Sequence, residues 1–87
     1  MTRLQLRDDG LKWREIDGEL VAVDVLTSTY VSANPSGMAL WQALAKGATR
    51  EALVDELVDS YGIDRERAGG DVDAFLDDLR RRDLLAA

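Results

Sequence analysis

The sequence predicts an α+β fold in which a small three-stranded antiparallel sheet is followed by three helices, a winged helix-turn-helix-like order. Two observations support this prediction. Alternating and β-branched apolar segments separated by turn residues fill the first third of the chain, whereas apolar residues recur at helical spacing from Pro35 onward. A chain of 87 residues suits one small domain. We therefore expect residues 1–87 to fold as a single unit.

The first third of the chain indicates three or four short strands. Apolar residues alternate with polar ones at 4–6 and again at 11–13, after an Asp-Asp-Gly turn. Asp17-Gly18 precedes the apolar run 20–26, and this dipeptide is typical of a tight hairpin because both residues tolerate positive φ. A less well-marked turn then leads into the strand 29–33, which is rich in β-branched residues.

Three helices are expected in the remainder of the chain. Asn34-Pro35 is a helix start, because Asn can cap exposed N–H groups and Pro suits the first helical position. The first helix should end at Lys46-Gly47-Ala48. Thr49 should cap a second helix that stops at Gly62, and Asp64 should start the third.

Four aromatic residues are candidates for core or binding positions. Trp13 and Trp41 are expected to anchor the core. Phe75 lies at the boundary of the apolar stripe of the third helix, beside charged residues, so it is either a core residue or one wall of a groove with a polar rim. Tyr30 is either an ordinary strand aromatic or a second wall of that groove, with its hydroxyl towards water.

The charge balance argues against nucleic acid as a partner. The chain has 17 acidic and 11 basic residues, a formal net charge of −6, and binding to phosphates depends on Lys and Arg. Acidic residues flank the basic cluster at 80–82, which is typical of a solvated helix surface. An acidic domain instead favours a basic or apolar protein segment. No apolar run approaches the roughly 20 residues of a membrane span, and the amino terminus lacks the apolar stretch of a signal peptide. A cytoplasmic protein with no membrane partner is expected.

Catalysis is not expected. Histidine and cysteine are absent, which excludes His-dependent catalytic triads and the usual His and Cys metal sites. Gly69-Gly70 lacks the spacing and the lysine of a phosphate-binding loop. Adjacent carboxylates such as Asp77-Asp78 diverge by about 100° on a helix. We therefore predict that the chain is not an enzyme and has no cofactor and no metal ligands.

A series of short motifs extends over nearly the whole chain. In order, they are Asp24-Val25, Tyr30-Val31-Ser32-Ala33-Asn34, Gly37 with Trp41, Gly47-Ala48-Thr49, Tyr61-Gly62-Ile63, Asp71-Val72 with Phe75-Leu76 and Leu79, and Leu84-Leu85. Together they resemble the PqqD-like proteins. These are the precursor-peptide recognition elements of pathways that make ribosomally synthesised, post-translationally modified peptides (RiPPs).

Two departures from the family pattern matter. Asp83 stands where the family commonly has Gly, which bears on how the third helix ends. The segment 21–25 replaces the Leu-Leu-x-Pro-Glu-like stretch of members that act in PQQ biosynthesis. The resemblance is therefore greatest to the standalone proteins of lasso-peptide pathways.

The resemblance implies that the domain binds the leader of a precursor peptide as an added antiparallel strand between the strand 29–33 and the third helix. It also implies presentation of the precursor to a separate leader peptidase, with an ATP-dependent macrocyclase as a further candidate partner. When the peptide contacts of the family are carried over to the matching positions of this sequence, they fall on Thr29, Tyr30, Val31, Ser32, Asp71, Ala74, Phe75, Asp78 and Leu79.

Three other interpretations remain open from the sequence. The domain could serve PQQ-type or other RiPP pathways as a peptide chaperone. It could be a transcription regulator with a winged-helix fold, or a dimerisation module that pairs the edge of its strand 29–33 with itself.

Overall fold

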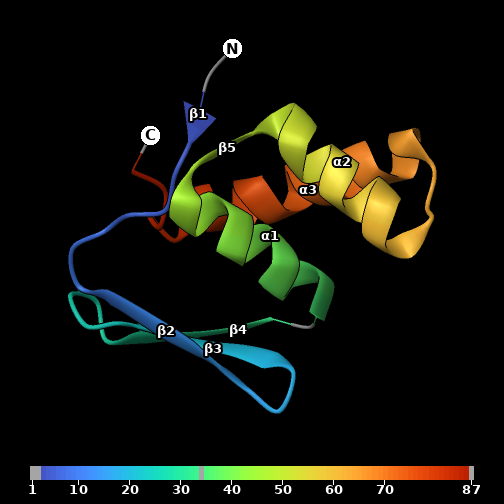
Figure 1. Cartoon of the computed structure of the whole chain (residues 1–87). Coiled ribbons are helices and arrows are strands. Elements are labelled where there is room, and N and C mark those ends of the chain that lie inside the picture. The colour runs from blue at the N-terminus through green and yellow to red at the C-terminus, as the bar shows by residue number, and fades with distance from the viewer. Residues whose placement is uncertain (1–2, 34, 87) are drawn as a thin grey trace.

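Three helices follow a three-stranded sheet in the computed structural model, which describes residues 3–33 and 35–86. The strands of this sheet are β2 (Leu11–Ile16), β3 (Glu19–Asp24) and β4 (Thr29–Ala33), and the helices are α1 (Pro35–Lys46), α2 (Arg50–Tyr61) and α3 (Arg65–Arg81). The predicted α+β class, with three antiparallel strands before three helices, is confirmed. Helix α1 lies between the sheet and the α2–α3 pair (Figure 1). The expected cap Asn34 lies outside the described residues.

A second, smaller sheet joins the two ends of the chain. Strand β1 (Arg3–Leu4) pairs with β5 (Ala48–Thr49), and Leu6 forms an isolated bridge with Leu85. The expected strand at 4–6 is therefore shorter and lies outside the main sheet. Strand β5 was not predicted from the sequence, because two residues are too few to show the alternation that marks a strand.

The order of the main sheet is β2-β3-β4, which makes β2 and β4 its edges. Strands β2 and β3 meet at Asp17 and Gly18, whose φ angles of 53° and 80° confirm the predicted tight hairpin. In the next pair, Asp24 lies opposite Thr29 and Leu20 lies opposite Ala33. The register thus places the end of β3 beside the start of β4.

The inner face of the sheet rests on α1. Leu20, Ala22 and Val31 are buried there. Trp41 of α1 is fully buried, as predicted. Trp13 contacts it edge-to-face with ring centroids 6.3 Å apart, but Trp13 is 38% exposed. Trp13 therefore packs against the core but is not buried in it, which corrects the prediction that it anchors the core. The reason is that β2 is an edge strand, so part of the indole ring is exposed to solvent.

The helix ends agree with the predicted signals. The hydroxyl of Thr49 accepts a hydrogen bond from the Ala52 amide (3.2 Å), and a carboxylate oxygen of Asp64 accepts one from the Arg67 amide (2.7 Å). Gly62 ends α2 in the left-handed conformation. After α3, Asp83 has a φ of 58°, a conformation that favours Gly but that Asp tolerates. The aspartate at this position therefore preserves the turn that a glycine would make.

Candidate functional site

Strand β4 has a free edge. It pairs with β3 on one side, and no other described strand pairs with it. Backbone N–H and C=O groups at such an edge remain available to an incoming strand. The predicted contacts Thr29, Tyr30, Val31 and Ser32 all lie on this strand.

An apolar pocket of about 570 Å³ opens where β4 gives way to α1. Leu40 of α1, Leu57 of α2 and Phe75 of α3 contribute apolar walls. Arg67 and Asp71, from the first two turns of α3, supply charged groups. Pro35 also lines the pocket, only two residues beyond the end of β4. A strand added along β4 would therefore lead towards this pocket.

Phe75 combines both roles considered from the sequence. It is partly buried against the hydrophobic core and it also lines the pocket. Asp71, one turn earlier on the same helix, lines the pocket with it. Arg67 makes no ion pair with any described residue, so its charge is available to a ligand. The pocket can hold a large apolar side chain and offers both signs of charge beside it.

The other predicted α3 residues lie elsewhere. Leu79 is 1% exposed, contributes to the core and does not line this pocket. Ala74 lies beside a separate shallow hollow with Asp77 and Arg80. Asp78 contacts two arginines of its own helix end, at 3.4 and 3.1 Å. The structure thus brings together Asp71 and Phe75 but not Ala74 or Leu79.

Tyr30 does not form the second wall of the pocket. Its side chain is 77% exposed and lines a different hollow, with Lys12 and Val23. Successive residues of a strand point to opposite faces, and the neighbouring Val31 faces the core. Tyr30 can therefore contribute its backbone to the free edge, while its ring lies on the outer side of the sheet.

Sequence reasoning missed several pocket residues, including Leu40, Leu57 and Arg67. From the sequence, Leu40 and Leu57 are expected only as core positions of amphipathic helices. Their spacing does not show that the two helices border a common pocket. Tyr61 and Ile63 also line the pocket. The motifs Tyr61-Gly62-Ile63 and Gly37 with Trp41 were available signals, because both are family motifs without an assigned role in binding and both contribute residues to the pocket lining.

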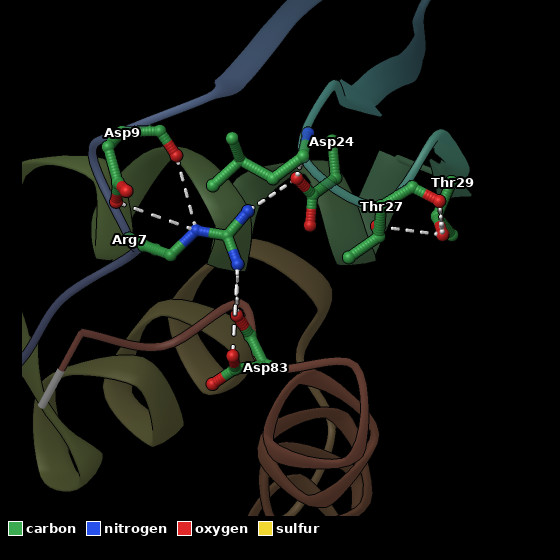
Figure 2. Close-up of polar contacts among 7 residues, drawn as sticks. Arg7, Asp9, Asp24, Thr27, Thr29 and Asp83 are labelled. Carbon is green, nitrogen blue, oxygen red and sulfur yellow. Dashed lines mark hydrogen bonds and ion pairs between the residues drawn. The ribbon is translucent and has the colours of Figure 1, made fainter.

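An ion-pair cluster joins the sheet to the end of α3. Arg7, from the connection between β1 and β2, points its guanidinium at Asp24, with Nη2 2.5 Å from Oδ1 (Figure 2). Its Nη1 donates to the carbonyl oxygen of Asp83 (2.8 Å) and its Nε donates to that of Asp9 (3.2 Å). The Asp24 side chain is 1% exposed and that of Arg7 is 15% exposed. One guanidinium therefore links the end of β3, opposite Thr29, with the segment that follows α3.

This arrangement stabilises the ionised form of Asp24. The hydrogen bond from Arg7 lowers the pKa of the Asp24 carboxyl below its ordinary value, although burial acts in the opposite direction. The amide of Leu26 also donates to Asp24 Oδ1 (3.1 Å) and lowers the pKa further. A buried carboxylate is tolerated here because it is paired and hydrogen-bonded.

The described part of the chain has neither a helix long and apolar enough to cross a membrane nor a cluster of three potential metal ligands.

The chain belongs to the PqqD family. The family model for coenzyme PQQ synthesis protein D (PqqD) matches residues 19–85, which include β3, β4 and all three helices. Within that class, the fold is similar to that of a solved structure described as TbiB1 in complex with the TbiA(beta) leader peptide. The two chains are 29% identical, with a TM-score of 0.86 over 95% of each.

A second solved structure, of lasso peptide synthetase B1 complexed with the leader peptide, shares the fold at 20% identity. Its TM-score is 0.84, over 97% of this chain and 98% of that chain. No curated protein sequence matches this chain.

Proposed function

We propose that this chain is a non-catalytic module that binds the leader of a precursor peptide in a lasso-peptide pathway. The observation that carries the proposal is the free edge of β4, which ends beside the apolar pocket lined by Phe75. Both similar structures hold leader peptides, and the 29% identity of TbiB1 supports the transfer of this role. The lack of histidine and cysteine supports a role without catalysis.

The leader would add to the sheet as an antiparallel strand along β4. Backbone hydrogen bonds to Thr29–Ala33 would supply affinity that depends little on sequence. Selectivity would come from the pocket, where a large apolar leader side chain contacts Leu40, Leu57 and Phe75. Arg67 and Asp71 would select polar groups of the leader next to that side chain.

The bound precursor would then be presented to a separate leader peptidase, with an ATP-dependent macrocyclase as a further partner. A non-catalytic domain would assist processing by holding the substrate for another enzyme. We place this exchange in the cytoplasm.

Titration of a fluorescent leader peptide into the purified domain tests the proposal. Phe75→Ala removes an apolar wall of the pocket and should weaken leader binding by about tenfold or more. Tyr30→Pro removes a backbone donor from β4 and should weaken binding as well. Ile16→Ala, on the far strand β2, is the matched control and should bind the leader as the wild type does.

Circular dichroism should show that each variant is folded. The proposal fails if the folded wild type does not bind the leader, or if Phe75→Ala and Tyr30→Pro both retain full affinity.

A further inference from the structure

The outer face of the main sheet carries exposed apolar side chains. Val21 and Val23 of β3 point away from the core, since Leu20 and Ala22 point into it. Across the sheet, Val23 lies between Lys12 and Tyr30, and Val21 lies between Arg14 and Ser32. Three of the seven exposed large hydrophobic residues lie on this face, namely Ile16, Val21 and Tyr30. We call the surface formed by Lys12, Arg14, Ile16, Glu19, Val21, Val23 and Tyr30 the outer face.

The outer face is left uncovered by the helices. Helix α1 packs against the opposite side of the sheet, and α2 and α3 lie beyond α1 (Figure 1). A hollow of about 320 Å³ lies on the outer face, lined in part by Lys12, Val21 and Tyr30. Contiguous exposed apolar patches with polar residues at their border mark interaction sites.

The two cations of the outer face lack acidic partners. Lys12 and Arg14 make no ion pair with any described residue. By contrast, Arg7, Arg50 and Arg65 are each paired with aspartate. On the outer face Lys12 and Arg14 outnumber the acidic Glu19, whereas the chain as a whole has a formal charge of −6. The two bases complement an apolar partner surface that contains acidic groups.

From these observations we infer that the outer face docks the leader peptidase, through an apolar surface of that enzyme that contains acidic residues. This inference rests on the proposed function and adds the surface that the enzyme uses. Tyr30 belongs both to the outer face and to the strand that would pair with the leader. An enzyme seated on the outer face would therefore lie next to the bound precursor.

A second copy of the chain fits this surface poorly. Twofold self-association would place the same patch on both sides of the interface. Lys12 and Arg14 of both copies would then be buried in one interface, and the mutual repulsion of four desolvated positive charges disfavours such a contact. A different protein avoids this repulsion.

The test uses the purified leader peptidase from the same gene cluster and the full chain, with binding followed by biolayer interferometry. Lys12→Glu should weaken peptidase binding by about tenfold, because it reverses a charge at the contact. Val21→Ser should weaken it by a similar factor, through loss of apolar contact. Lys46→Glu makes the same charge change at the end of α1 and should leave peptidase binding unchanged. All three variants should bind the leader peptide with wild-type affinity.

Equal peptidase binding by Lys12→Glu and Lys46→Glu would overturn the inference. So would a wild-type dimer, detected by light scattering, that Lys12→Glu dissociates, because the occupant would then be a second copy. A wild type that binds the leader but not the peptidase would overturn the docking site and leave the proposed function intact. A wild type that binds the peptidase through Lys12 but not the leader would support the docking site and overturn the proposed function.

Discussion

The Arg7–Asp24 ion pair connects the sheet that carries the candidate site with the segment that follows α3. Asp24 is the one buried charged residue among the described residues, and it lies opposite Thr29 of the edge strand. Arg7 reaches both Asp24 and the carbonyl oxygen of Asp83, beyond α3. Removing one partner of a buried pair leaves the other charge uncompensated. The pair therefore fixes the position of β4 relative to the end of α3.

This pairing predicts a pH-dependent contribution to stability. Arg7 lowers the pKa of Asp24 in the folded state, so the contribution is fully present above the unfolded pKa of about 3.9 and is lost as pH falls through the lower folded pKa. Asp24→Asn should be less stable than wild type at neutral pH. The difference between them should shrink as the pH falls below about 4. Urea denaturation at a series of pH values measures this difference.

Asp59→Asn is the matched control, because Asp59 is exposed and has no ion pair with a described residue. Its stability should follow that of wild type across the series. A constant gap between wild type and Asp24→Asn at all pH values would show that the charge of Asp24 does not contribute as described.

Single residues show where the sequence is informative and where it is not. Asp24 interrupts an apolar run, and that interruption signals a special environment, but nothing local identifies Arg7 as its partner. Phe75 could be placed at the edge of the apolar stripe from helical periodicity. Tyr30 could not be assigned to a face, because alternation fixes which residues share a face but not which face is buried.

At the scale of elements, the cap of α3 holds one side of the pocket. Asp64 accepts a hydrogen bond from the Arg67 amide (2.7 Å), and Arg67 lines the pocket. Asp64→Ala should cost about 1 kcal/mol of stability, the usual effect of losing such a cap. Loosening of the first turn should also weaken leader binding, because Arg67 would no longer be held at the pocket.

Chemical denaturation and leader titration measure the two effects of Asp64→Ala. Asp64→Ser is the control, since serine also caps helices well, and it should retain most of both properties. If Asp64→Ala binds the leader as wild type does, the first turn of α3 plays no part in recognition.

Element boundaries were predictable wherever a specific backbone signal exists. Thr49, Gly62 and Asp64 set helix ends through their side chains or through positive φ, and each is found in that role. The strands β1 and β5 had no such signal, since their pairing depends on contact between distant parts of the chain. Which α3 residues line the pocket could not be read from the sequence, because their exposure depends on how α3 packs against α2.

At the scale of the whole molecule, the sheet has two free edges and the proposal requires that only one be used. Strand β2 carries Lys12, Arg14 and Glu15 within six residues, and charges on an edge strand discourage pairing. Strand β4, with the sequence TYVSA, carries none. The edge of β4 also leads towards the pocket lined by Phe75. Both differences favour β4 as the edge that receives a peptide.

Hydrogen–deuterium exchange distinguishes the two edges directly. Leader binding should slow exchange of amides in 29–33, because an added strand protects N–H groups that were open to solvent. The segment 71–75, which lines the pocket, should be protected as well, because bound peptide would cover it. Exchange in 11–16 should not change. Protection of 11–16 in place of 29–33 would assign the peptide to β2, and it would separate the binding edge from the pocket that we propose gives selectivity.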